Sequence, residues 1–284
     1  MPKDRPDHQR HGGSGTFSPT ADAGSRVTMV QMPRSGEAGD AAIPSFNFLM
    51  ILLTFAGTGL AIQFGLGGQK GLAFVFVLAG WVLSLCLHEF GHAFVAWKGG
   101  DHAIAGTGYL TLDPRLYIDP LTSIVLPVLF TILGGIGFPG GAVFVNRDLL
   151  RSPMWQSAVS LAGPAMNLAF LVFLVLLYGL ASEDADTIRA VLAVSALYQA
   201  TAIVLNLLPI PGLDGYGIIR PWIPDGAREA GDQIGRYSGL VITGLFLLSG
   251  AFTRAIFGAG LTITASFGFS PQDVVTGYRL MRLW

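Results

Sequence analysis

The sequence predicts an all-α polytopic membrane protein with about six transmembrane or re-entrant helices and one small β-hairpin element. The first observation is composition: hydrophobic residues make up 51% of the 284 residues, charged residues make up 12%, and the mean hydropathy is +0.56. A soluble domain carries about 25% charged residues, so most of this surface does not face water. The second observation is that the apolar residues form long continuous runs, whereas strands of a membrane β-barrel alternate apolar and polar residues.

The apolar runs are assigned by length, because a helical span needs about 20 apolar residues. Four runs are long enough to cross a bilayer, and two further apolar segments are shorter or interrupted. The four candidate spans cover residues 47–66, 72–97, 157–181 and 188–209. The two further apolar segments cover residues 119–138 and 239–270. The last segment is expected to form two short helices that turn near Arg254.

Residues 1–44 differ from the rest of the chain. They are rich in Gly, Pro, Ser and mixed charges, and they lack both apolar periodicity and the hydrophobic stretch of a signal peptide. We expect a disordered cytoplasmic tail here, followed by a membrane-embedded domain at residues 45–284. The net charge of −1 and the lack of a basic patch predict no nucleic-acid partner, and the single cysteine, Cys86, excludes an intrachain disulfide.

The segment 119–138 decides the predicted topology, because a crossing here would move every later loop to the other side of the membrane. If the tail is cytoplasmic and the segment re-enters, fourteen of the 17 Lys and Arg residues lie inside. The three left outside are Lys70, Arg189 and Arg254. Positive charges concentrate on cytoplasmic loops, so the re-entrant arrangement is favoured over a full crossing. It places Arg279 on the same side as Lys98.

A metal-binding signature lies near the cytoplasmic end of the second span. His88-Glu89-Phe90-Gly91-His92 matches H-E-x-x-H, and residues four apart share one helix face, so His88 and His92 can bind one metal ion together. Glu89 can then take a proton from water at the metal. The alternative is that polar neighbours satisfy all three side chains. Ionisable residues inside a span are costly and mark function by default, which favours the metal site.

Spacing along the chain does not identify the third metal ligand. Four residues soon after the motif carry suitable groups: Asp101, His102, Asp113 and Asp119. The longer spacing H-E-x-x-H-x-x-G-x-x-H fails, because Val95 and Lys98 occupy the glycine and third-histidine positions. Asp214 is the stronger candidate, because it follows the helix-breaking Pro209 and Pro211 at the same predicted depth as the motif. A solvated Asp-Gly turn is an equally good interpretation of its spacing.

Three motifs occur in order within residues 72–217. They are His88-Glu89-x-x-His92, Ala162-Gly163-Pro164-Ala165-Met166-Asn167 and Asn206-x-x-Pro209-x-Pro211-x-Leu213-Asp214-Gly215. Together they resemble the site-2 protease family of intramembrane zinc metalloproteases. The resemblance implies one Zn²⁺ per chain, held by His88, His92 and Asp214. It also implies an endopeptidase that cuts transmembrane segments of other proteins in regulated intramembrane proteolysis. The chain lacks PDZ-like and CBS-like domains and so resembles the minimal members.

The resemblance also implies catalytic roles. Glu89 would accept the water proton and pass it to the leaving amine. Asn167, with Asn206 second, is the candidate hydrogen-bond donor to the tetrahedral oxyanion, and hydrogen bonding between helices is the alternative for both. The stretch 140–146 has strand character. We expect it either to pair with an unwound substrate or to form a hairpin with Thr107–Leu112.

The expected location is the cell membrane, with the lipid bilayer and transmembrane protein substrates as partners. His92 lies about 9 Å from Lys98 along a helix, which puts the site near the cytoplasmic face. Two other functions are a non-catalytic zinc-binding scaffold or adaptor and a metal transporter. A structural zinc site prefers four protein ligands and needs no acid such as Glu89. A transport path would need polar steps, and the span before His88 offers no acidic or histidine residue.

Overall fold

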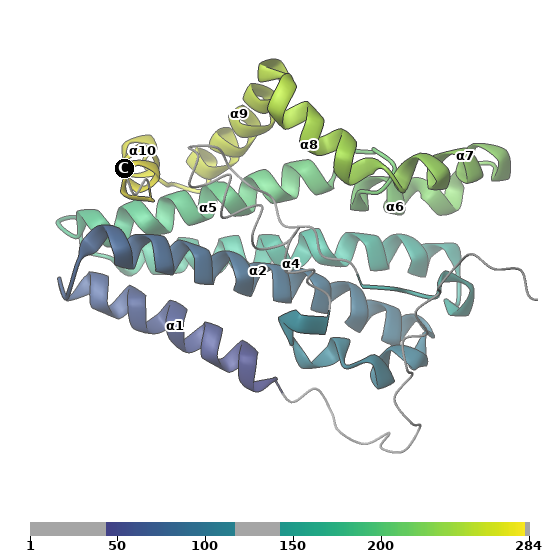
Figure 1. The fold of residues 1–284 in the computed structure, drawn as a ribbon, viewed down its shortest axis with the longest axis horizontal. Coiled ribbons are helices and arrows are strands. Elements are labelled where there is room, and N and C mark those ends of the chain that lie inside the picture. Colours follow the sequence, from purple (N-terminus) through teal and green to yellow (C-terminus); the bar gives the residue numbers. More distant parts are fainter. Residues whose placement is uncertain (1–43, 117–142, 282–284) are drawn as a thin grey trace, which may run out of the picture. The chain divides into compact units, whose positions relative to one another are not determined.

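The computed structural model describes residues 44–116 and 143–281, and the regular secondary structure of these residues is helical throughout (Figure 1). The α-helices are α1 (Phe46–Gln63), α2 (Gln69–Gly99), α4 (Pro153–Leu180), α5 (Asp186–Asn206), α6 (Asp214–Ile219), α7 (Asp225–Gly235), α8 (Ser238–Leu248), α9 (Gly250–Ser266) and α10 (Pro271–Met281). Short 3₁₀-helices lie at His102–Thr107, Tyr109–Thr111, Pro114–Leu116, Arg147–Leu149 and Arg220–Trp222.

Four helices correspond to the four candidate spans, with ends that differ by a few residues. In the part of the chain that the structure describes, α1, α2, α4 and α5 are long and apolar enough to cross a membrane. The bent pair α8 and α9 makes a fifth if it counts as one span. The predicted count of six is therefore not confirmed. The segment 119–138, which would have been the sixth, lies outside the described residues.

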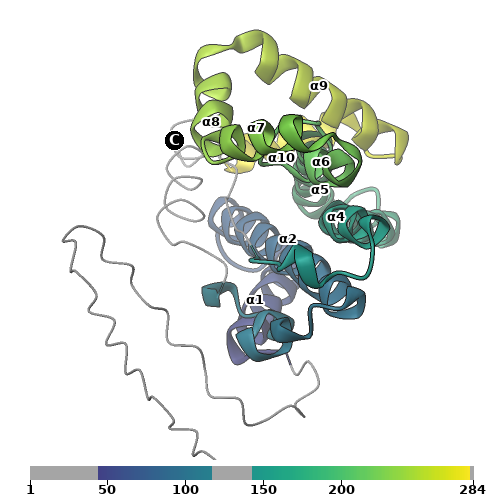
Figure 2. The same cartoon turned by 90° about the vertical axis from the view of Figure 1, so that its right-hand side faces the viewer.

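Helix α5 is the most buried of the four candidate spans. It packs against α4, α9 and α10, while α2 packs against α1 and α4 (Figure 2). Small side chains explain how α5 is enclosed, because they let neighbouring helix backbones approach closely. The fully buried alanines of α5 are Ala190, Ala193, Ala196 and Ala200. Helix α1 buries only three of its side chains and leaves most of its apolar surface exposed, as lipid contact requires.

The helix bundle has two ends, each named here for one residue. At the Lys98 end, the last turn of α2 meets the start of α4, where the Arg151 N–H donates to the Gly99 carbonyl at 2.9 Å. At the Arg189 end, a short connection joins α4 to α5. Helix α4 has 28 residues, so about 40 Å separates the two ends along it.

The flanks of residues 117–142 both lie at the Lys98 end. Before this segment, Asp113 accepts hydrogen bonds from Asn47 Nδ2 at 3.0 and 3.2 Å, beside the start of α1. After it, the Asn146 N–H donates to Asp101 Oδ2 at 2.8 Å. The described chain thus departs and returns at one end of the bundle, and the prediction that the intervening segment re-enters stays a prediction. The segment itself lies outside the described residues.

The C-terminal helices differ from the expected arrangement. Helices α8 and α9 meet at 96°, and the break is at Ser249 rather than near Arg254, which lies inside α9. Helix α10 then packs against the first turns of α5, where Asp273 pairs with Arg189 at 3.4 Å. Arg279 belongs to this helix, whereas the expected topology puts it on the same side as Lys98. By length and composition α8 and α9 fit either one broken span or a re-entrant loop, so the side of Arg279 stays a prediction.

The predicted β-hairpin is not confirmed. Most of its expected partner strand, Thr107–Leu112, is 3₁₀-helical, and no strand occurs within residues 44–116 and 143–281. The backbone explains the difference, because Gly108 and Leu112 have φ angles of 80° and 60°. Such left-handed residues interrupt an extended strand. Residues 140–142 of the other predicted strand lie outside the described part of the chain.

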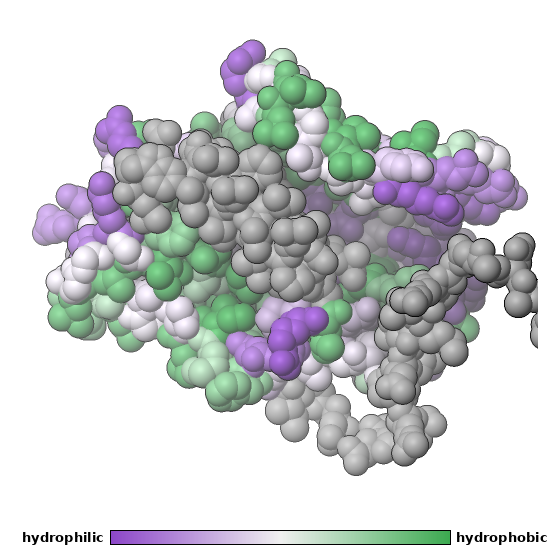
Figure 3. Space-filling model, in the orientation of Figure 1, coloured by the Kyte–Doolittle hydropathy of each residue, from purple (hydrophilic) through white to green (hydrophobic). Residues whose placement is uncertain are grey.

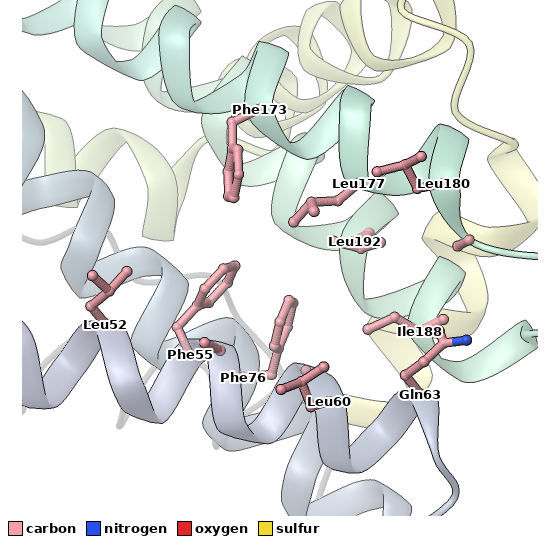
Figure 4. Close-up of a pocket in the computed structure, with 13 residues that line it drawn as sticks. Leu52, Phe55, Leu60, Gln63, Phe76, Phe173, Leu177, Leu180, Ile188 and Leu192 are labelled. Carbon is pink, nitrogen blue, oxygen red and sulfur yellow. The ribbon is translucent and has the colours of Figure 1, made fainter.

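An apolar cavity of about 440 Å³ opens between α1, α2, α4 and α5 (Figure 4). Phe55, Phe76 and Phe173 line it from three of these helices, and Gln63 is the polar exception among its lining residues. None of the lining residues belongs to the three motifs, so the cavity is separate from the candidate metal site. Figure 3 shows hydrophilic side chains over α7 and beside α10, with apolar side chains over α1.

The ion pair at the Arg189 end yields a prediction about stability. Tyr178 donates to Asp273 at 2.5 Å and accepts from Arg189 at 2.7 Å, so this cluster joins α4, α5 and α10. Asp273→Ala should destabilise the fold by about 1–3 kcal/mol, because both partners lose a charged acceptor. Asp273→Asn keeps an acceptor for Tyr178 and should cost less. Thermal unfolding of detergent-purified protein measures both variants.

The control for this prediction is Glu183→Ala, in the exposed connection at the same end. It should leave the Tm within the error of the wild type. An unchanged Tm for Asp273→Ala would mean that the cluster does not stabilise the docking of α10.

Candidate metal centre

Helix α2 supplies the first two metal-binding groups. His88 and His92 lie one turn apart on the same face, and their Nε2 atoms are 3.0 Å apart. Both rings face α4, where Gly163 lies against them. A Cβ added at Gly163 would be 2.6 Å from His88 Cε1 and Nε2, so only glycine leaves room for the rings at this point. The glycine of the second motif thus permits the close approach of α4 to the histidines.

Asp214 joins the two histidines from a distant part of the sequence. It is the first residue of α6, with Oδ2 at 3.2 Å from His88 Nε2 and Oδ1 at 3.3 Å from His92 Nε2. The next residue, Gly215, packs on the end of α5: an added Cβ would be 2.5 Å from the Leu207 carbonyl carbon. The Asp-Gly pair therefore belongs to a packed helix start rather than to a solvated turn, and the structure brings all three predicted ligands together.

The three donors suit a zinc ion. Zinc binds imidazole nitrogen and carboxylate oxygen tetrahedrally, and bonds of about 2.0–2.1 Å set neighbouring donors about 3.3 Å apart. The separations of 3.0, 3.2 and 3.3 Å are close to that value. Among the described residues, His88, His92 and Asp214 form the group that could hold a metal ion. Three protein ligands leave one position for water, as in catalytic zinc sites.

Helix α4 also accepts a hydrogen bond from Nδ1 of each histidine ring, the nitrogen that faces away from the metal position. His92 Nδ1 donates to the Val159 carbonyl at 2.7 Å, and His88 Nδ1 donates to Asn167 Oδ1 at 2.6 Å. A carbonyl oxygen accepts hydrogen bonds and cannot donate them, so each contact puts the ring proton on Nδ1. The Nε2 lone pairs then face Asp214 and the metal position. Such outer contacts orient metal-binding histidines in many proteins.

Glu89 lies beside the group without joining it. Its side chain is buried, and its Oε2 accepts a hydrogen bond from the Val143 N–H at 3.0 Å. The Val143 backbone belongs to the stretch for which the sequence predicts strand character. The carboxylate is therefore held next to the two histidines by a single backbone donor, in the position expected of a base that exchanges protons with water at the metal.

The structure assigns different surroundings to the two predicted asparagines. Asn167 is buried behind His88, and its Nδ2 donates to Ser84 Oγ at 2.8 Å and to Gln199 Oε1 at 3.0 Å. Asn206 is the last residue of α5 and is partly buried, close in sequence to the turn that leads to Asp214. Sequence reasoning missed Ser84 and Gln199, because nothing in their own spacing relates them to the metal motif.

A second missed feature is the clamp that fixes α6. Tyr216 donates to the Arg228 carbonyl at 3.1 Å and to Asp232 Oδ1 at 3.2 Å, and Arg220 Nε donates to the same oxygen at 2.8 Å. The Arg220 guanidinium lowers the pKa of Asp232, so the ion pair persists under mildly acidic conditions. These contacts join the short α6, which carries the third ligand, to α7.

Asp214 itself is ionised in this setting. Burial works to raise the pKa of Asp214, but the neighbouring His88 and His92 side chains outweigh burial and hold that pKa below its usual range. An ionised carboxylate is the form that binds a metal ion. The Asp214 carboxylate and the two imidazoles together therefore form a ligand set suited to a divalent cation.

The other acidic and histidine candidates do not join the group. Asp101 is buried and accepts from the Asn146 N–H, while Asp113 binds Asn47 and Arg115. His102 is exposed at the start of a 3₁₀-helix. Asp119 lies outside the described residues. Among the residues that the structure describes, Asp214 is thus the candidate third ligand that lies beside the two histidines.

Comparison with known proteins finds similar proteins in three bacterial species. The chain is 42% identical over 249 residues to "Putative zinc metalloprotease Rip2" of Mycolicibacterium smegmatis, and 44% identical over 252 residues to the protein of that name in Mycobacterium tuberculosis. Each match covers 85% of this chain and 94% of the relative. "Putative zinc metalloprotease YwhC" of Bacillus subtilis is 34% identical over 175 residues, which are 58% of this chain and 77% of the relative. No family model matches the chain, and no solved structure matches it significantly.

The close approach at Gly163 yields a prediction about metal binding. Gly163→Ala should lower zinc affinity at least about tenfold, because the new methyl group displaces the His88 ring from its position against α4. Chelator competition on the purified chain measures the affinity. The matched control is Gly179→Ala on the same helix, where an added Cβ meets nothing within 4 Å. Equal zinc affinity in both variants would contradict the steric role of Gly163.

Proposed function

The chain belongs to the site-2 protease family of intramembrane zinc metalloproteases, and from that premise we propose that it is an intramembrane zinc endopeptidase. Its substrates would be membrane proteins, cut at peptide bonds in or near their transmembrane segments. The observation that carries this proposal is the convergence of His88, His92 and Asp214, with Glu89 beside them, among helices apolar enough to span a membrane.

The proposed chemistry divides between the metal and the chain. Zinc bound by the two histidines and Asp214 would supply Lewis-acid activation of water and of the scissile carbonyl. Glu89 would accept the proton of the attacking water and then deliver it to the leaving amine. Asn206 is the candidate donor to the developing oxyanion, since it lies at the C-terminal end of α5, a few residues before the turn that carries the third ligand.

The substrate segment must unwind before attack, because an α-helix encloses its peptide bonds in hydrogen bonds. Residues Val143–Asn146 are suited to bind an unwound segment. They have no regular secondary structure, Phe144 is 80% exposed, and the Val143 N–H contacts Glu89. We propose that an extended substrate adds alongside this stretch, which would bring its backbone next to the general base.

The proposed location is the cell membrane, with the site near the cytoplasmic face and fragments released there by regulated intramembrane proteolysis. Cation–aromatic contacts at the Lys98 end support an interface there. Lys98 Nζ lies 4.5 Å from the Trp97 ring centroid, and the Arg151 guanidinium lies 5.7 Å from that of Trp155. Tryptophan and basic residues are typical of the membrane–water boundary, and basic residues of its cytoplasmic side.

A non-catalytic zinc scaffold is the main alternative, and Glu89 argues against it. A structural site gains nothing from a buried carboxylate next to three ligands, whereas a hydrolytic site requires a base at that position. A metal transporter is disfavoured because residues 69–87 of α2 carry no acidic or histidine side chain on the way to the site.

Glu89→Gln tests the proposed function. Cleavage of a reporter transmembrane segment by the purified chain in liposomes should fall about 10²–10⁴-fold, because the amide cannot accept the water proton. Zinc content should stay near one per chain. Asp101→Asn is the control: it changes a buried carboxylate at the same bundle end, and an amide oxygen can still accept from Asn146. Cleavage by Glu89→Gln at the wild-type rate would exclude Glu89 as the base.

A further inference from the structure

We propose that Ser84, Gln199 and Asn167 form a directional hydrogen-bond relay that fixes the His88 imidazole with its Nε2 free to bind zinc. Gln199 and Ser84 are then positioning residues for the metal centre, although neither contacts the metal ligands directly. The inference rests on the proposed function only for the identity of the metal. Its test measures metal binding, so it can fail or succeed independently of proteolysis.

The relay joins three helices through four contacts. Ser84 Oγ of α2 donates to Gln199 Oε1 of α5 at 2.5 Å. Asn167 Nδ2 of α4 donates to both of these side chains, and Asn167 Oδ1 accepts from His88 Nδ1 at 2.6 Å. Ser84 and His88 are four residues apart and so share one face of α2. The relay thus begins one turn before the first metal ligand and ends on it.

The direction of the relay follows from donor and acceptor chemistry. In the structure Gln199 presents Oε1, which only accepts, so the side of the Asn167 amide that faces it is the NH₂ side. The oxygen of Asn167 then has to face His88, and it can only accept the Nδ1 proton. With that proton on Nδ1, the Nε2 lone pair points to the metal position. A flipped Asn167 amide would instead present its NH₂ group to His88 and favour the tautomer that cannot bind zinc through Nε2.

The three relay side chains are buried, so each depends on its hydrogen-bond partners within the relay. Ser84, Gln199 and Asn167 are 3%, 3% and 4% exposed, so water does not compete for their hydrogen bonds. Each also lies within a helix apolar enough to span the membrane. A buried polar group without a hydrogen-bond partner costs free energy. The orientation of each side chain in the relay therefore depends on the orientation of its neighbour.

The two histidines differ in how they are held, and this difference singles out His88. His92 Nδ1 donates to the Val159 backbone carbonyl, which has no alternative orientation. His88 depends on an amide side chain that could flip if its own partners were lost. Substitutions in the relay should therefore weaken zinc binding through His88 while the backbone contact of His92 is preserved.

The relay also bears on the role of Asn167. Its Nδ2 donates to Ser84 Oγ and Gln199 Oε1 and its Oδ1 accepts from His88, so the polar contacts of Asn167 are with the relay and the histidine ring. This arrangement makes Asn167 a positioning residue. The two roles predict different behaviour for Asn167→Asp, because a carboxylate can still accept from His88 but cannot donate to an oxyanion.

The experiment compares zinc affinity across relay variants of the full chain in detergent, by chelator competition. Gln199→Leu and Asn167→Leu should each weaken zinc binding about 10–100-fold, as loss of an outer contact does at other metal sites. Asn167→Asp should lose less zinc affinity than Asn167→Leu, since its carboxylate can still accept the hydrogen bond from His88 Nδ1. Ser195→Ala, one turn earlier on α5, is the matched control: its buried hydroxyl bonds only its own helix at Val191.

A second measurement keeps the proposal testable if the leucine variants fold poorly. Ser84→Ala removes one member of the relay with a helix-favouring residue, and it should also weaken zinc binding, though less than Gln199→Leu. The Co²⁺-substituted chain should show an altered visible absorption in the relay variants and an unchanged one in Ser195→Ala. Wild-type zinc affinity in both Gln199→Leu and Ser84→Ala would overturn the proposal. So would equal losses in Asn167→Asp and Asn167→Leu.

Discussion

His88 and His92 present Nε2 to a common point because α4 holds the other nitrogen of each ring. That interaction holds α4 against the two rings, and Gly163 is the position at which an added Cβ would meet both of them. The rest of the site depends on it. Asp214 can complete the ligand set only if the two imidazoles already face the end of α5, where α6 begins.

The third ligand, Asp214, depends in turn on α6, a helix too short to be stable alone. Six residues of α6 carry Asp214, and isolated helices shorter than about 12 residues are marginal. The hydrogen bonds of Tyr216 and Arg220 to α7 replace the stability that length would provide. The metal centre is thus built from two long, buried helices and one short helix that is anchored from outside the membrane-spanning segments.

The sequence predicted those features that follow from spacing along one helix. The positions of His88 and His92 on one face are intrinsic to any α-helix, so the first two ligands were predictable from the motif. Asp214 was ambiguous from spacing, and only the combined motifs favoured it. Ser84 and Gln199 could not be found, because their relation to His88 exists only after α4 and α5 pack against α2. Charge counting could not reveal that α10 docks on α5 through Gly277 and Asp273, because that contact joins residues far apart in the chain.

The order in which the relay residues are synthesised has a consequence for biogenesis. Ser84, His88 and Glu89 enter the membrane on α2, yet the partner Asn167 follows 83 residues after Ser84 and Gln199 follows 115 residues after it. At 5–20 residues per second, roughly 4–17 s pass before α4 reaches the nascent α2. During that interval α2 carries polar groups that lipid cannot satisfy. The same side chains that define the metal centre thus leave α2 with unsatisfied polar groups until α4 and α5 pack against it.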